Sequence, residues 1–257
     1  MPEPEYLGLP LFFNAEWGEW PMSAALSSTS LAQSFRKGTQ AYDFIAATPL
    51  VVWNTLTMAG SVGPLRQQMD RLFLRPDLTL CLSVLSRIAV LLFAMAVIGL
   101  LFVRRPPRSS AHGWAPRAIA VLGTYLSVGI VLLQTTHLPR LSPLWSAIST
   151  LLIFGGMGFA CYGIVFLGRS FSVTPQARKL VTGGPYAVVR HPLYLGEAIA
   201  TVGVLIPYVS PLTVSLFALQ LVCQIFRMQL EEQVLSRAFP EYEQYKARTA
   251  RLLPGVY

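Results

Sequence analysis

Charged residues are scarce in this sequence of 257 residues. Asp, Glu, Lys and Arg make up 12% of the chain, and 53% of it is hydrophobic, whereas soluble domains carry about 25% charged residues. A bilayer core about 30 Å thick is crossed by roughly 20 apolar residues of helix. The sequence therefore predicts an all-α, polytopic integral membrane protein. Its uncharged stretches are 44–65, 88–103, 118–139, 141–168 and 198–226.

Cysteine and histidine are also rare, with three of each. Cys81, Cys161 and Cys223 lie far apart in apolar segments, without a Cys-x-x-Cys pair or a Cys/His cluster. We therefore expect no disulfide framework and no metal site. No Gly-x-Gly-x-x-Gly motif follows a strand-like run, which argues against a soluble dinucleotide-binding domain. The net charge of +8 comes from residues at the ends of apolar runs, so we expect contact with membrane lipids and not with nucleic acid.

The chain divides into three parts. Residues 1–36 are rich in Pro, Ser and acidic residues and predict a leader without the basic start of a cleavable signal peptide. Residues 37–140 predict N-terminal transmembrane helices at 41–62, 78–103 and 117–138, with a short interfacial helix within 64–77. Residues 141–257 predict a span at 143–167, a polar loop and a final apolar block. The total is about five to six transmembrane segments.

The final apolar block, 193–229, is too long for one crossing, since a single helix would measure roughly 55 Å. Pro207 and Pro211 interrupt it near the middle. We therefore predict a helical hairpin whose ends, His191 and Glu231, meet on one face of the membrane. Beyond it, the amphipathic segment 231–251 predicts a cytoplasmic tail helix or helix pair with a break at Pro240.

Positive residues indicate the orientation. The loops 104–117 and 169–190 contain eight Lys and Arg residues, and the loops 64–77 and 139–142 contain four. Because positive residues concentrate in cytoplasmic loops, the hairpin ends and the C-terminus are expected in the cytoplasm. We expect a bacterial inner membrane protein with its active face toward the cytoplasm.

An ordered set of motifs surrounds the hairpin. Leu180-Val-Thr-Gly-Gly-Pro-Tyr186 is followed by Arg190-His-Pro-Leu-Tyr194, then by Arg227…Glu231-Glu232 and Tyr242-x-x-Tyr245. In this order, residues 165–255 resemble the isoprenylcysteine carboxyl methyltransferase family and its relatives among the membrane phospholipid methyltransferases.

The resemblance implies a site for S-adenosylmethionine and for a lipophilic acceptor. Arg227 matches the family arginine that faces the substrate carboxylate, and it shares a helix face with Glu231, four residues on. Glu197 is either the buried partner of an arginine or a residue of the substrate cavity. Gly183 and Gly184 predict a tight turn that brings backbone close to a ligand. The cofactor contacts implied by the resemblance are Lys179, Leu180, Val181, Tyr186, His191, Pro192, Leu193, Tyr194 and Glu231.

The expected function is methyl transfer from S-adenosylmethionine to a lipophilic or lipidated acceptor, with a carboxylate as the acceptor group. One alternative is methylation of a phospholipid or other amine, for which His191 or Glu232 would be the candidate base. Another is an NADPH-dependent enzyme like the membrane sterol reductases, which have a similar hairpin. Tyr242 and Tyr245 are expected to be packing residues, and the glycines of span 143–167 to be sites of helix packing.

Overall fold

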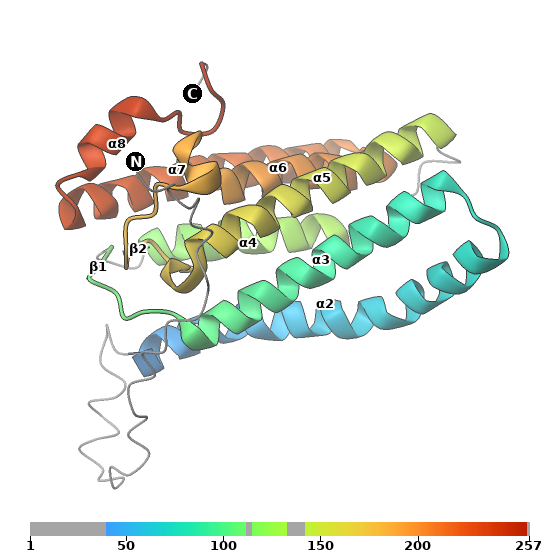
Figure 1. Ribbon diagram of the computed structural model, residues 1–257, viewed down its shortest axis with the longest axis horizontal. Helices are drawn as coiled ribbons and strands as arrows, with labels where there is room; N and C mark the ends of the chain where they lie inside the picture. Colours follow the sequence, from blue (N-terminus) through green and yellow to red (C-terminus); the bar gives the residue numbers. More distant parts are fainter. Residues whose placement is uncertain (1–39, 112–114, 133–141, 256–257) are drawn as a thin grey trace, which may run out of the picture.

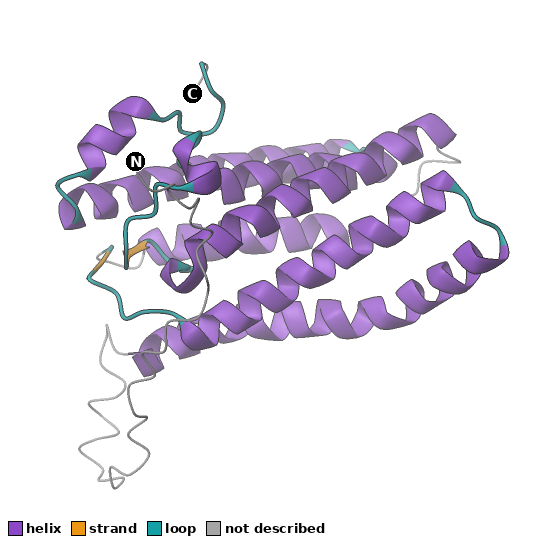
Figure 2. Cartoon of the chain, in the orientation of Figure 1, coloured by secondary structure: helices purple, strands orange, loops and turns teal. Residues whose placement is uncertain are grey.

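The computed structural model describes residues 40–111, 115–132 and 142–255, and the predicted leader lies outside them (Figure 1). These residues are mostly helical (Figure 2). Within these described ranges, three helices are long and apolar enough to cross a membrane, and the apolar helix 192–208 is shorter. The prediction of an all-α membrane protein is confirmed. The main elements are α2 (Gln40–Leu74), α3 (Leu78–Val103), β1 (Ser109–Ser110), α4 (Ala115–Leu132), α5 (Pro143–Leu167), β2 (Gln176–Ala177), α6 (Pro192–Leu205), α7 (Pro211–Ala238) and α8 (Tyr242–Arg248).

The helices begin where capping residues stand in the sequence. The Asp77 carboxylate accepts a hydrogen bond from the backbone N–H of Leu80 at 3.1 Å at the start of α3. Ser210 and Thr213 form a reciprocal capping box at the start of α7. Such caps pair backbone donors that a helix leaves free in its first turn.

The helix α2 runs through Pro64 without a break, so the predicted separate helix at 64–77 is wrong. Proline removes one backbone hydrogen bond, which membrane helices tolerate when neighbouring groups compensate. The second half of α2 is tied to α3 by Gln68. Its amide donates to Ser83 Oγ at 3.1 Å and accepts from Arg87 Nε at 3.1 Å.

Small residues let α5 and α6 approach closely. A Cβ added at Gly156 would lie 2.5 Å from the backbone nitrogen of Ala200, and one at Gly196 would lie 2.6 Å from the carbonyl oxygen of Gly156. The prediction of helix packing therefore holds for Gly156. It does not hold for Gly155 and Gly158, beside which the described residues leave open space.

The predicted hairpin is confirmed, with its turn at Val209 and Ser210. The first arm, α6 with the short 3-10 helix 206–208, is about 27 Å long, and α7 needs about 30 Å to return from Pro211 to Glu231. Both ends therefore lie at the same end of the bundle (Figure 1). The arms do not pack mainly on each other: α6 packs on α5, and α7 packs on α4. This separation was not predicted, and it leaves space between the arms.

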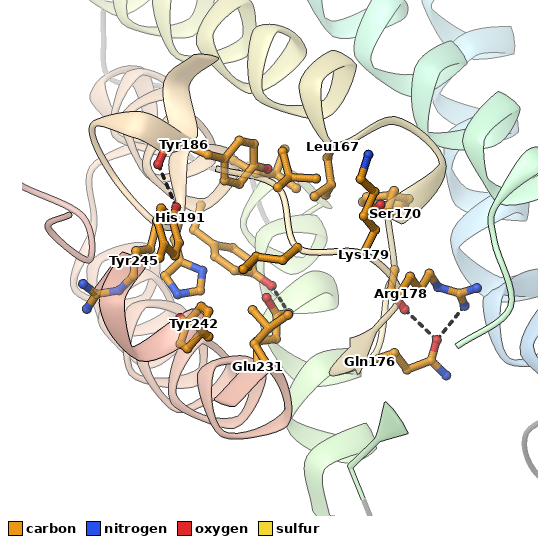
Figure 3. A pocket seen from close by; sticks show the side chains of 18 of the residues that line it. Leu167, Ser170, Gln176, Arg178, Lys179, Tyr186, His191, Glu231, Tyr242 and Tyr245 are labelled. Atoms are coloured by element: carbon orange, nitrogen blue, oxygen red, sulfur yellow. Dashed lines mark hydrogen bonds between the residues drawn. The ribbon is translucent and has the colours of Figure 1, made fainter. Parts of the chain in front are cut away.

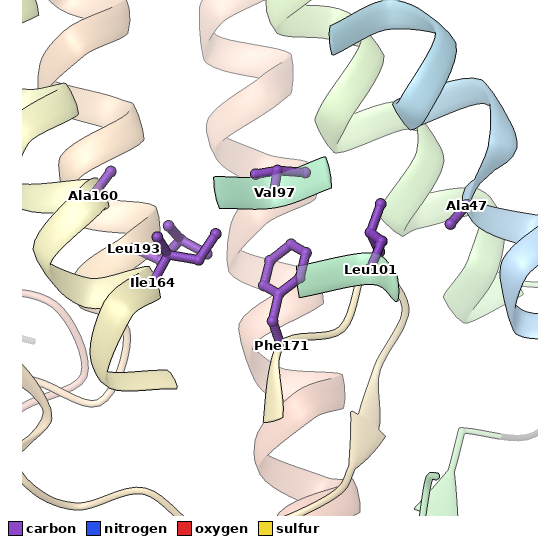
Figure 4. Close-up of a cluster of buried hydrophobic side chains, with 7 residues drawn as sticks. All are labelled: Ala47, Val97, Leu101, Ala160, Ile164, Phe171 and Leu193. Carbon is purple, nitrogen blue, oxygen red and sulfur yellow. The ribbon is translucent and has the colours of Figure 1, made fainter. Parts of the chain in front are cut away.

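Figure 4 shows a cluster of buried apolar side chains. It joins α2, α3, α5, α6 and the loop after α5. Phe171 and Leu193 of the cluster also line the cavities described below. The core therefore fixes the position of the cavity walls. Its members are Ala47, Val97, Leu101, Ala160, Ile164, Phe171 and Leu193.

Candidate functional site

A first cavity lies at the end of the bundle where the hairpin begins and ends (Figure 3). Its space is about 770 Å³, part of it open to solvent. Pro192 is not among its lining residues, because it is buried in the contact of α6 with Gly163 of α5. The other predicted cofactor contacts all line it: Lys179, Leu180, Val181, Tyr186, His191, Leu193, Tyr194 and Glu231.

A second cavity of about 1050 Å³ lies between the helices, next to the first. Both predicted substrate residues, Glu197 and Arg227, line it. Its other lining residues are mainly apolar and come from α2, α3, α4, α5, α6 and the loop after α5. The predicted parts 37–140 and 141–257 therefore build this cavity together.

The two cavities share a wall made of Phe171, Leu193 and Tyr194. The Tyr194 hydroxyl donates a short hydrogen bond to the Glu231 carboxylate. The Arg227 guanidinium lies 5.0 Å from the centre of the Tyr194 ring, within the range of a cation–π contact. Tyr194 thus contacts a charged residue of each cavity.

Arg227 is fixed from several directions. Its Nη2 donates to the carbonyl oxygen of Val173 at 2.7 Å, its Nη1 to Thr124 Oγ1 at 3.3 Å and its Nε to Glu231 Oε1 at 3.3 Å. Its side chain is buried, with 8% of its surface exposed. A buried guanidinium with this many partners keeps one orientation at the end of the apolar cavity.

Glu197 connects the two arms of the hairpin across the space between them. Its carboxylate accepts a hydrogen bond from Gln224 Nε2 at 3.2 Å. Among the described residues it forms no ion pair within 4.0 Å, and it lines the second cavity together with Arg227.

Glu232 is the centre of a cluster that the site prediction missed. Its Oε1 accepts hydrogen bonds from Arg190 Nε at 2.9 Å, from His191 Nε2 at 3.1 Å and from Arg251 Nε at 3.0 Å, and its Oε2 accepts from Arg251 Nη2 at 2.9 Å. We call these four residues the Glu232 clasp. The available signal in the sequence was the basic pair Arg190-His191 at one end of the hairpin and the acidic pair Glu231-Glu232 at the other. Neighbouring positions on α7 point in different directions, so Glu231 faces the cavity while Glu232 holds the tail.

The glycine-rich turn before α6 approaches α5 and not a ligand. Gly184 has a φ of +58°, and a Cβ there would lie 2.4 Å from the ring of Phe166. The tight turn is present, but the group that its backbone approaches is the aromatic ring of Phe166. The turn places Tyr186 in the cavity wall, where burial raises the pKa of its hydroxyl, as does the charge of Glu231.

A family model and several known proteins are similar to parts of this chain. A family model described as phospholipid methyltransferase matches residues 144–242. A nickel-cobalt-cadmium resistance protein of Alcaligenes xylosoxydans is 28% identical over 145 residues, which are 54% of this chain and 65% of that protein. A cobalt-zinc-cadmium resistance protein of Cupriavidus metallidurans is 32% identical over 83 residues, 30% of this chain and 36% of the relative.

A plant protein, the protein-S-isoprenylcysteine O-methyltransferase B of Arabidopsis thaliana, is 35% identical over 101 residues, 36% of this chain and 51% of that protein. The chain thus spans less than two thirds of the length of each of these relatives. The segment matched by the family model contains every predicted site residue, from Lys179 to Glu231. The phospholipid methyltransferase family model thus matches residues 144–242, and the resemblance identified from the motifs is confirmed.

Proposed function

We propose that this protein transfers a methyl group from S-adenosylmethionine to a lipophilic acceptor in the membrane, and that the acceptor group is a carboxylate. One observation carries the proposal: a cavity that is open to solvent and has charged side chains in its lining meets a mainly apolar cavity between the helices at Tyr194. The basic loops at this end of the bundle support an orientation toward the cytoplasm, in keeping with a bacterial inner membrane.

The residues of the first cavity suit the cofactor. S-adenosylmethionine carries a carboxylate, an ammonium group, a ribose diol and an adenine ring, and it supplies a methyl group activated by a positive sulfonium. Lys179 provides a cation for the carboxylate, and Glu231 accepts hydrogen bonds from hydroxyl or ammonium groups. Tyr186 and Leu193 provide aromatic and apolar walls.

Arg227 suits the acceptor carboxylate. It lies at the shared wall, in the cavity that a lipid chain would fill. A carboxylate is already ionised, so no general base is needed. Catalysis then depends on orientation, which contributes about 7–11 kcal/mol in favourable cases, and on the exclusion of water.

An amine acceptor is the second candidate, because Glu197 lines the same cavity without an ionic partner among the described residues. A buried carboxylate there would pair with an ammonium group. The family description, phospholipid methyltransferase, also favours an amine. The bases suggested from the sequence, His191 and Glu232, bond to each other on the side of the tail.

Purified protein in detergent, given cofactor with a labelled methyl group, separates the two candidates. N-acetyl-S-farnesylcysteine offers a carboxylate, and vesicles of phosphatidylethanolamine offer an amine. A methyl ester releases volatile methanol in mild base, whereas a methylated amine does not. We expect base-labile product. Base-stable label in the lipid would establish the amine reaction instead.

Arg227→Lys tests the role of the arginine. Lysine keeps the charge but loses the several directed hydrogen bonds, so we expect the rate to fall about 100-fold, the loss typical of a misplaced reacting group. Arg237→Lys, an exposed position on the same helix, is the matched control and should retain full activity. Equal rates for both variants would remove Arg227 from the mechanism.

Calorimetric titration with S-adenosylhomocysteine and, separately, with NADPH tests the reductase alternative. We expect binding of the first and none of the second. Binding of NADPH alone would refute the proposed function.

A further inference from the structure

The C-terminal tail forms one wall of the first cavity. The helix α8 contributes Tyr242 and Tyr245 to it. The tail is held by the Glu232 clasp and by backbone hydrogen bonds: Arg190 N–H donates to the carbonyl oxygen of Ala250 at 2.8 Å, and His191 N–H donates to that of Arg251 at 3.1 Å. These contacts place α8 over the cavity without involving the Tyr242 hydroxyl.

Tyr242 is as buried as a packing residue, but its side chain carries a polar hydroxyl. Only 1% of its surface is exposed, and its ring packs with Ala177, Val234 and Phe239. Among the described residues no group forms a hydrogen bond with its buried hydroxyl. An unpaired buried hydroxyl destabilises a protein, and phenylalanine would fill the same space without that cost. Packing alone therefore does not account for a tyrosine here.

The hydroxyl of the neighbouring Tyr245 differs from that of Tyr242 in its hydrogen bonding. The Tyr245 hydroxyl donates to the carbonyl oxygen of Tyr186 at 2.7 Å, so it is paired within the protein. Figure 3 shows Tyr242 on the same side of the cavity as His191 and Glu231. The clasp already occupies the nearby Glu232 carboxylate.

The Tyr242 hydroxyl keeps its proton. Burial raises its pKa above the usual value, and the negative charge of Glu232 raises it further. It is therefore a hydrogen-bond donor at physiological pH, and it belongs to a residue that lines the first cavity.

We infer that the Tyr242 hydroxyl donates a hydrogen bond to the cofactor in the first cavity, which makes the C-terminal tail part of the binding site. The inference rests on the proposed function, since it takes an adenosyl cofactor as the ligand. It replaces the expectation that Tyr242 is only a packing residue. The hydroxyl lacks a partner in the free protein because its partner arrives with the ligand.

Tyr242→Phe in the full-length protein tests this directly. Calorimetric titration with S-adenosylhomocysteine should give a Kd about three- to tenfold weaker than that of the wild type, the usual effect of one hydrogen bond. The Tm of the ligand-free variant in detergent should be equal to or higher than that of the wild type, because an unpaired polar group has been removed.

Two other tyrosines serve as controls. Tyr245→Phe should lower the Tm of the ligand-free protein, because it removes a hydrogen bond within the protein. Tyr162→Phe, at a position 48% exposed on α5, should change neither the Tm nor the Kd.

A Kd for Tyr242→Phe within twofold of the wild type would overturn the inference, and so would a lowered Tm of the ligand-free variant, since the hydroxyl would then have a partner in the protein. If the wild type itself binds no S-adenosylhomocysteine, the proposed function fails, and this inference fails with it. Unchanged affinity in the variant beside clear binding by the wild type refutes only the role of Tyr242.

Discussion

Replacing Glu232 by glutamine should release the C-terminal tail from the end of α6. Glutamine keeps the shape of the side chain but has no charge, and its amide nitrogen cannot accept the hydrogen bonds that one carboxylate oxygen accepts now. The side chains of Glu232 and Arg190 are 5% and 9% exposed, so the pair is buried. Breaking a buried ion pair costs about 3–5 kcal/mol.

The lost free energy should appear as local opening of the C-terminal tail, because the clasp joins only this tail to the core. The backbone N–H groups of Arg190 and His191 donate to the tail, so their hydrogen exchange reports its detachment. At about 1.4 kcal/mol for each factor of ten, their protection should fall by roughly two to three and a half powers of ten. Mass spectrometry of peptides covering 186–194 measures this.

Glu241→Gln provides the matched control, since Glu241 is exposed at the start of α8 and is not part of the clasp. In this variant the hydrogen exchange of the Arg190 and His191 N–H groups should match that of the wild type. If protection in Glu232→Gln stays within tenfold of the wild type, the clasp does not hold the tail, and the reasoning from burial and charge is wrong.

Two pairs of glycine variants test the close contacts. Gly196→Ala should lower the Tm and the yield of folded protein, because overpacking costs about 1–3 kcal/mol, whereas Gly158→Ala should be neutral or slightly stabilising since its surroundings are open. Gly184→Ala should reduce both the Tm and the affinity for S-adenosylhomocysteine through strain at positive φ and collision with Phe166. Gly183→Ala should be tolerated in both assays. A reversed order within either pair would contradict the packing described.

The hairpin could be predicted from the sequence because it depends on properties of single segments. Pro207 and Pro211 interrupt a stretch too long for one crossing, and the two resulting arms match the thickness of a bilayer. From that alone it followed that His191 and Glu231 reach the same end of the bundle. Both do line one cavity. Their roles toward a ligand stay predictions.

The rest depended on how helices rotate and pack, which the sequence does not display. Glu231 and Glu232 are adjacent and chemically identical in the sequence. The rotation of α7 decides that Glu231 faces the cavity and that Glu232 binds the tail. The separation of the hairpin arms results from the close fit of Gly156 and Gly196 between α5 and α6. The separate helix expected at 64–77 is instead the second half of α2, where Gln68 contacts Ser83 and Arg87 of α3.

Tyr194 lies in the wall that the two cavities share. Under the proposed function the cofactor and the acceptor bind in different cavities, so neither ligand blocks the site of the other. We expect initial-rate kinetics of a ternary complex with random order of addition, and not a scheme in which one product must depart before the second substrate enters. Thicker or thinner bilayers should change the KM for the acceptor and leave that for the nucleotide as it was.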